Sequence, residues 1–77
     1  MNLEKYQNVF TETLGIEESQ LENLKYQDVD AWDSIGHMGL ITALEETFSI
    51  MFETDDIIDM NSFAKGKEIL RKYNVEL

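Results

Sequence analysis

Residues 33–48 read DSIGHMGLITALEETF, and the other segments can be interpreted around them. Asp33 is a predicted N-cap, because its carboxylate can accept from the free N–H groups of a first helical turn. The segment predicts a helix over about residues 34–48, with the Ser34 hydroxyl exposed at the start. We expect the apolar positions of this helix to share one core-facing side. These positions are Ile35, Met38, Ile41, Leu44 and Phe48.

The segment before this helix predicts a first helix and then a long loop. The first helix should end at Gly15, since a residue without Cβ enters the left-handed conformation at little cost. Its apolar stripe is Leu3, Tyr6, Val9, Phe10 and Leu14. Residues 16–32 lack a sustained period and predict a loop, in which Trp32 is one of several scattered apolar anchors to the core.

Two shorter patterns follow the central helix. Thr54 or Asp55 is the candidate cap of a short helix over residues 56–59, and Asn61 or Ser62 is the candidate cap of a last helix. The apolar stripe of the last helix is Phe63, Ile69, Leu70 and Tyr73. The expected fold is all-α: one domain over residues 1–77, a small four-helix bundle with three longer helices packed antiparallel and a short third helix.

Composition limits the function classes. The chain has 77 residues, no Cys and a net charge of −10, and no Lys or Arg lies between residues 26 and 64. Such a charge repels nucleic-acid phosphates and anionic lipid, so we expect neither as a partner. No apolar run reaches the roughly 20 residues of a membrane span. We therefore expect a cytoplasmic monomer without a disulfide or a thiolate metal site.

The central segment resembles the prosthetic-group site of the acyl carrier protein family. The matching residues are Asp33-Ser34-Ile35, Leu40, Leu44-Glu45-Glu46 and Phe48. The resemblance extends from residue 3 to about residue 73. It implies that Ser34 carries a covalent 4'-phosphopantetheine, with Asp33 in a supporting role, and that the arm's thiol holds an acyl group as a thioester.

In that reading the protein is a carrier and not an enzyme. A nucleophilic serine needs an activating base within hydrogen-bonding reach, and the chain has one imidazole, His37, which we expect to be neutral and exposed one turn after Ser34. A separate phosphopantetheinyl transferase would supply the base. A loading ligase and acyltransferase or synthase enzymes with basic docking patches would then be the further partners.

The resemblance also implies a docking face and an acyl groove. The docking face would use Met38 and the carboxylates of Glu45, Glu46, Asp55, Asp56 and Asp59, although these charges could also be a solvated surface. The groove would lie between the second and third helices. Its expected lining is Met38, Ile41, Leu44 and Ile57.

Gly36 and Gly39 depart from the fatty-acid carrier pattern, in which acidic residues occupy both positions. One interpretation is drift, and the other is that the missing side chains leave room for a partner's backbone or for the arm. The second interpretation, with Trp32 and Glu53 also atypical, favours a specialised pathway over general fatty-acid synthesis.

Two other functions fit the same sequence. A free-standing aminoacyl or D-alanyl carrier, loaded by an adenylating ligase, would use the same serine and fold. An unmodified acidic helical adaptor would use only its surface, and replacing Ser34 would then leave partner binding intact.

Overall fold

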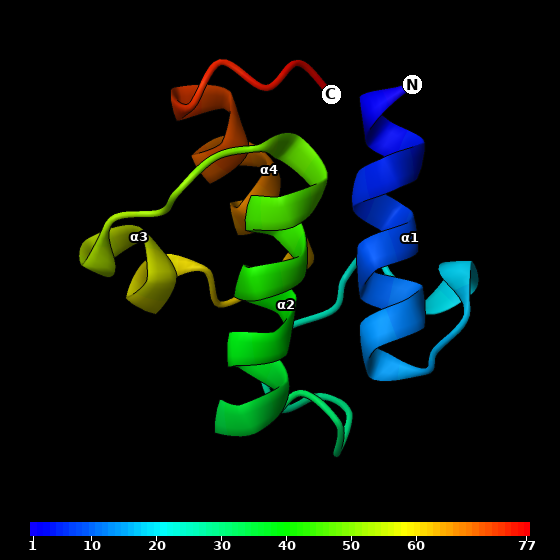
Figure 1. Cartoon of the computed structure of the whole chain (residues 1–77). Coiled ribbons are helices and arrows are strands. Elements are labelled where there is room, and N and C mark those ends of the chain that lie inside the picture. The colour runs from blue at the N-terminus through cyan, green and yellow to red at the C-terminus, as the bar shows by residue number, and fades with distance from the viewer.

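Four α-helices and one short 3₁₀ helix make up the chain in the computed structural model, which describes residues 1–77 (Figure 1). The elements are α1 (Asn2–Leu14), η1 (Glu18–Gln20), α2 (Ser34–Phe48), α3 (Thr54–Asp59) and α4 (Phe63–Lys72). The predicted all-α fold, with three longer helices, a short third helix and a long first loop, is confirmed. None of the helices combines the length and the apolar character that crossing a bilayer requires.

The helix ends follow local hydrogen bonding. Gly15 has a φ of 66° and its N–H donates to the Thr11 carbonyl, so it terminates α1 as predicted. The Asp33 and Ser62 side chains cap α2 and α4 by accepting from the N–H groups of the third helical residues. The prediction for α3 was wrong, because this helix begins two residues early at Thr54, after Glu53, with no side-chain cap.

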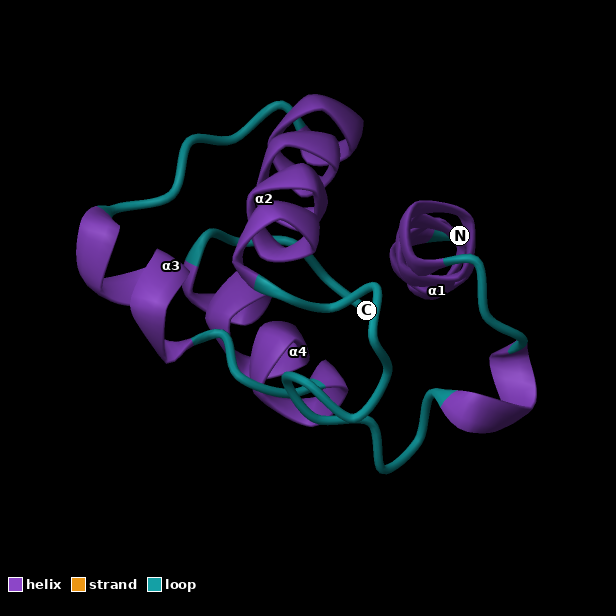
Figure 2. Ribbon diagram, turned by 90° about the horizontal axis from the view of Figure 1, so that it is seen from below, coloured by secondary structure: helices purple, strands orange, loops and turns teal.

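Helices α1 and α2 lie side by side and run in opposite directions, and α4 packs across them (Figures 1 and 2). Leu3 is exposed, so it does not belong to the buried stripe predicted for α1. The buried apolar side chains form one cluster. Its members are Tyr6, Val9, Phe10, Leu14, Leu21, Leu24, Trp32, Leu40, Ile41, Leu44, Phe52, Met60, Phe63, Ile69, Leu70 and Val75.

The core-facing side of α2 differs from the prediction. Ile35 is 83% exposed and Met38 is 50% exposed, whereas Leu40, Ile41 and Leu44 are buried. An α-helix turns by about 100° per residue, so position 44 lies about 180° around the helix from position 35. The apolar positions therefore span two sides of α2. One side enters the core, and the first two turns leave Ile35 and Met38 at the surface.

Backbone pairing holds the long loop against the start of α4. The Tyr26 N–H donates to the Asn61 carbonyl at 2.9 Å, and the Phe63 N–H donates to the Leu24 carbonyl at 2.9 Å. This isolated antiparallel bridge fixes the middle of the loop. Leu21, Leu24 and Trp32 then fill the core below it, which confirms the expected apolar anchoring.

Tyr6 joins α1 to α4. Its hydroxyl donates to the Phe63 carbonyl, and its ring packs on those of Phe10 and Phe63. Burial raises the pKa of the Tyr6 hydroxyl, because the phenolate would lose its hydration. A Cβ at Gly66 would lie 2.1 Å from this hydroxyl, so a glycine is required where α4 approaches α1.

Candidate functional site

Ser34 is the first residue of α2, and its side chain is exposed. Asp33, in an extended conformation, accepts from the Gly36 N–H through Oδ1 at 2.8 Å. The Ser34 hydroxyl takes part in none of the side-chain hydrogen bonds of the structure. The predicted N-cap is confirmed, and it leaves the hydroxyl free at the positive end of the helix dipole, where a phosphate is favoured.

The loop before Ser34 is pressed against the first turn of α2. A Cβ at Gly36 would lie 1.8 Å from the carbonyl oxygen of Ala31, a distance that no side chain can accept. At Gly39 a Cβ would meet only the Thr13 methyl of α1, at 3.5 Å. The missing side chain at Gly36 thus makes room for the protein's own loop, and Gly39 faces α1. At Gly36 the interpretation as space for a partner or the arm therefore does not fit the structure, whereas for the exposed Gly39 it stays a prediction.

Trp32 fixes the residue just before the Asp33-Ser34 pair. Its side chain is fully buried, and its ring packs edge-on against Phe10 and Tyr26. The Trp32 carbonyl accepts from the Gln27 N–H at 3.1 Å, and its own N–H donates to the Val29 carbonyl at 3.0 Å. Side chain and backbone together hold the start of α2 in place relative to the core.

His37 links three separate segments. Its Nδ1 accepts from the Trp32 indole N–H at 3.0 Å, and its Nε2 lies 2.7 Å from the Ile57 carbonyl of α3. Since Trp32 can only donate, Nδ1 must be the unprotonated nitrogen, and Nε2–H then donates to Ile57. The two rings are nearly parallel, at an interplanar angle of 15° and with centroids 6.3 Å apart, as a hydrogen bond between ring edges requires. The expectation of an exposed histidine was wrong; a neutral ring fits these partners.

The His37 bond completes the end of α3. The last carbonyls of a helix have no partner within the helix, and here the Met60 N–H goes to Asp56 and the Asn61 N–H goes to Asp59. The Ile57 carbonyl is satisfied from α2 instead. We call the two hydrogen bonds of the His37 ring, from Trp32 and to Ile57, the latch.

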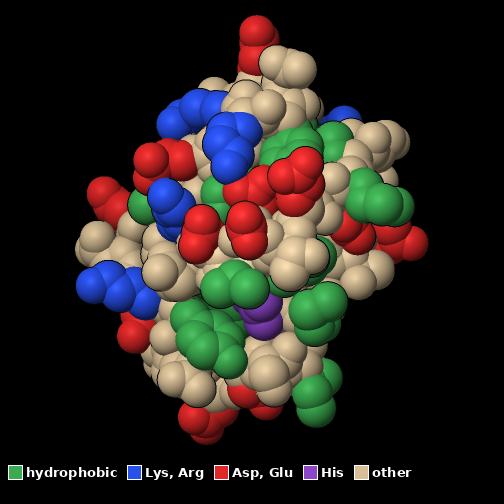
Figure 3. All heavy atoms as spheres, turned by 90° about the vertical axis from the view of Figure 1, so that its left-hand side faces the viewer, with side chains coloured by type: hydrophobic (Ala, Val, Ile, Leu, Met, Phe, Trp, Pro, Cys, Tyr) green, Lys and Arg blue, Asp and Glu red, His purple; other side chains and the backbone are tan.

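Hydrophobic side chains gather around the latch at the surface. Ile35, Met38 and Ile58 are all at least half exposed. Figure 3 shows hydrophobic groups surrounding the single histidine on this face, with acidic side chains next to them. Ser34 directly precedes Ile35 on α2, so its side chain lies next to an exposed apolar residue.

A small pocket of about 160 Å³ opens beside His37. Its lining residues are Tyr26, His37, Ile57, Ile58, Met60 and Asn61. Sequence patterns pointed only to Ile57 for this region. Tyr26 and Met60 were missed as site residues because they come from the long loop and from the end of α3, which local periodicity does not bring together.

The four residues of the expected acyl groove do not line one cavity. Ile41 and Leu44 are buried in the core, Met38 is at the surface, and Ile57 lines the small pocket.

The predicted docking carboxylates fall into two groups. Glu46, Asp55 and Asp59 are exposed. Glu45 is half-buried and accepts from the Phe52 N–H at 2.9 Å, which ties the loop after α2 back onto the helix. Asp56 is buried, so a role in docking does not fit it.

Asp56 instead anchors α3 to the end of α4. It accepts from Lys72 Nζ at 2.6 Å and from the Tyr73 hydroxyl at 2.6 Å, while the Tyr73 oxygen accepts from the Glu53 N–H. The hydrogen bonds from Lys72 and Tyr73 lower the pKa of Asp56. The bond to Asp56 raises the pKa of both Lys72 and Tyr73. Two consecutive residues of α3 are thus attached to other helices: the Asp56 side chain to the end of α4, and the Ile57 carbonyl to His37 of α2.

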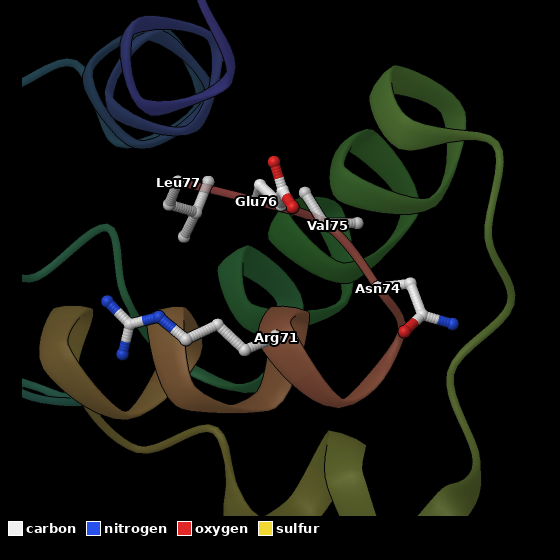
Figure 4. A pocket seen from close by; sticks show the side chains of 5 residues that line it. All are labelled: Arg71, Asn74, Val75, Glu76 and Leu77. Carbon is white, nitrogen blue, oxygen red and sulfur yellow. The ribbon is translucent and has the colours of Figure 1, made fainter.

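A larger hollow lies near the C-terminal segment, away from the start of α2. It has a volume of about 380 Å³ and is bounded by Arg71, Asn74, Val75, Glu76 and Leu77 (Figure 4). In Figure 1 this segment is at the opposite end of the molecule from Ser34. The hollow contributes nothing to the site.

Comparison of this chain with family models, curated proteins and solved structures finds no match.

Proposed function

We propose that this protein is a stand-alone acyl carrier protein whose Ser34 accepts a phosphopantetheine arm. The observation that carries the proposal is the free, exposed Ser34 hydroxyl at the first position of α2, directly after the Asp33 cap. The sequence motif around it resembles the one that the carrier family uses for attachment.

The residues present fit such a group. The N-terminal turn of α2 offers free N–H groups and a positive dipole end to a phosphate. The apolar surface of Ile35, Met38 and Ile58 lies beside it and could receive the uncharged part of an arm. When bound, the arm would supply a thiol that holds the cargo as a thioester.

The chain contributes an oxygen nucleophile and a rigid support. Attachment forms a bond from Ser34 Oγ to the pantetheine phosphorus of coenzyme A and breaks the pyrophosphate bond, while a separate transferase takes the hydroxyl proton. His37 is unsuited to that task, because both of its ring nitrogens are already hydrogen-bonded. No carboxylate forms an ion pair with the ring either. This geometry supports a substrate of the transferase and not a self-contained hydrolase.

Docking by charge is part of the same proposal. Glu46, Asp55 and Asp59 are exposed, and the chain carries a net charge of −10. Enzymes with basic patches would be drawn to such a surface, since complementary charge speeds encounter more than it slows dissociation.

The absence of cysteine allows a direct test with a thiol reagent. After incubation with coenzyme A, Mg²⁺ and a broad-specificity transferase, the purified protein should carry one reactive thiol per chain. This thiol can come only from the attached arm, because the chain itself has no cysteine. Ser34→Ala should carry no thiol. Ser19→Ala, which removes another exposed serine, is the matched control and should behave as wild type. Wild type without a thiol, beside a control carrier that gains one, would refute the proposal.

A further inference from the structure

We propose that the hydrogen bond from Trp32 to His37 holds Ser34 where the transferase can modify it, so that Trp32 and His37 are positioning residues for attachment of the arm. The inference rests on the proposed function, since it concerns the reaction at Ser34. Two observations carry it: the hydrogen bond spans the attachment serine, and the start of α2 has no buried side chain.

The first two turns of α2 place no side chain in the core. No residue from Asp33 to Gly39 is buried, and Leu40 is the first buried residue of this helix. Figure 1 shows this part of α2 extending past the end of α1. A helix end with few buried contacts opens locally at little cost in free energy. The position of Ser34 therefore depends on the contacts between the start of α2 and the loop before it.

His37 provides the side-chain contact between this turn and the core. Among the side chains of residues 34–39, only that of His37 forms hydrogen bonds. Its Nδ1 accepts from the indole N–H of Trp32, which is fully buried and packs against Phe10 at 5.4 Å between ring centroids. The bond therefore ties the helix on one side of Ser34 to a core residue on the other side.

The remaining hydrogen bonds of this turn are local. The Asp33 side chain accepts from the Gly36 N–H at 2.8 Å, and the Asp33 carbonyl accepts from the His37 N–H at 2.8 Å. These bonds join residues three and four positions apart, so they fix the shape of the turn but not its place relative to the core. The Trp32 indole is the hydrogen-bond donor that connects this turn to the interior.

A fixed place for Ser34 matters for the transfer reaction. The hydroxyl must lie in line with the phosphate that it attacks, and a small displacement of a reacting group lowers the rate steeply. The apparent affinity of an enzyme for one conformation of its substrate also falls in proportion to the population of that conformation. Loss of this one hydrogen bond should therefore lower kcat/KM for attachment roughly two- to tenfold.

Two substitutions separate the two hydrogen bonds of His37. The Asn amide is as many bonds from Cβ as Nδ1 is, so His37→Asn keeps an acceptor for Trp32 and does not reach the Ile57 carbonyl. The Gln amide matches Nε2, so His37→Gln keeps a donor for Ile57 and leaves Trp32 without an acceptor. Each variant loses one hydrogen bond, so a role limited to stability would affect both alike.

The test measures kcat/KM for phosphopantetheine transfer to these variants and to Trp32→Phe, which removes the indole N–H and keeps an aromatic ring. His37→Asn should match wild type, whereas His37→Gln and Trp32→Phe should each fall roughly two- to tenfold. Combining His37→Gln with Trp32→Phe should cause no further loss, because both remove the same bond. Thr42→Ala, at an exposed position on α2, is the control and should match wild type.

The indole resonance reports the bond itself. The chain has one Trp and one His, so one indole N–H signal describes this contact. The signal should keep its hydrogen-bonded chemical shift in His37→Asn and lose it in His37→Gln.

Intact mass after prolonged incubation separates this inference from the proposed function. Variants that all gain one arm, but with equal kcat/KM for His37→Asn and His37→Gln, would overturn the positioning role and leave the proposed function standing. Wild type that gains no arm would refute the proposed function, and this inference with it.

Discussion

Gly36 and Gly39 belong to one turn of α2 but differ in what a side chain would meet. At Gly36 a Cβ would lie 1.8 Å from the Ala31 carbonyl oxygen, whereas at Gly39 the nearest group is a methyl at 3.5 Å. We expect Gly36→Ala to lower the free energy of unfolding by roughly 1–3 kcal/mol, because the backbone at Ala31 would have to move to accept the new methyl group. Gly39→Ala should raise it by up to about 1 kcal/mol through helix propensity.

Thermal melting of the two variants measures this difference directly. Each is the other's control, because both make the same chemical change within one turn. Equal effects of the two substitutions would show that the contact between the loop and α2 is not fixed by Gly36.

The hydrogen-bond partners of His37 could not be predicted from the sequence. Its position in the first turn of a helix suggests an exposed ring, yet its ring bonds to Trp32 and to a carbonyl 20 residues away. The partner on α3 is a main-chain carbonyl. Every residue has one, so the residue types in the sequence do not indicate which carbonyl His37 contacts. Asp33 and Ser62 could be predicted as caps because capping depends only on the next three residues.

At the level of the helices, α3 depends on Asp56. The hydrogen bonds from Lys72 and Tyr73 lower its pKa below the ordinary value of 3.8. A carboxylate with a lowered folded-state pKa adds stability above its unfolded value, and that stability is lost as pH falls through the folded value. The attachment of α3 to α4 should therefore hold at neutral pH and fail only below about pH 3.8.

Asp56→Asn tests this pH dependence. Melting temperature should fall at pH 7 by about 4–8 °C for each hydrogen bond lost, and the difference from wild type should close below pH 3.8. Asp55→Asn, an exposed neighbour in the same turn, is the matched control and should change little. A difference that stays constant down to pH 2 would mean that ionised Asp56 does not anchor α3.

The helices themselves could be predicted because their patterns are local. Gly15 ended α1 as expected, and the apolar stripe of α4 is buried at Phe63, Ile69 and Leu70. Which side of α2 faces the core could not be predicted in the same way, because its apolar residues cover two sides of the helix. Only packing against α1 determines which of these sides is buried. The bridge between residues 25 and 62 likewise depends on the tertiary fold.

For the molecule as a whole, charge repulsion is the main unfavourable electrostatic effect. The chain has sixteen acidic and six basic residues, and only one ion pair forms, between Lys72 and Asp56. Added salt screens the repulsion, since the Debye length falls from about 30 Å at 0.01 M to about 3 Å at 1 M. Melting temperature should therefore rise by several degrees over this range.

A variant with less charge provides the control for the salt effect. The triple substitution Glu46→Gln, Asp55→Asn and Asp59→Asn removes exposed carboxylates without touching the core. It should melt higher than wild type at low salt and respond less to added salt. If wild type does not respond to salt at all, its charges are too dispersed to repel one another.

The attachment of an arm to Ser34 is the central claim, and the intact mass of the protein tests it most directly. After reaction with coenzyme A and a broad-specificity phosphopantetheinyl transferase, wild type and Ser19→Ala should each gain the mass of one phosphopantetheine, and Ser34→Ala should gain none. Wild type that stays unmodified where a known carrier is modified, or Ser34→Ala that gains the same mass, would contradict the claim.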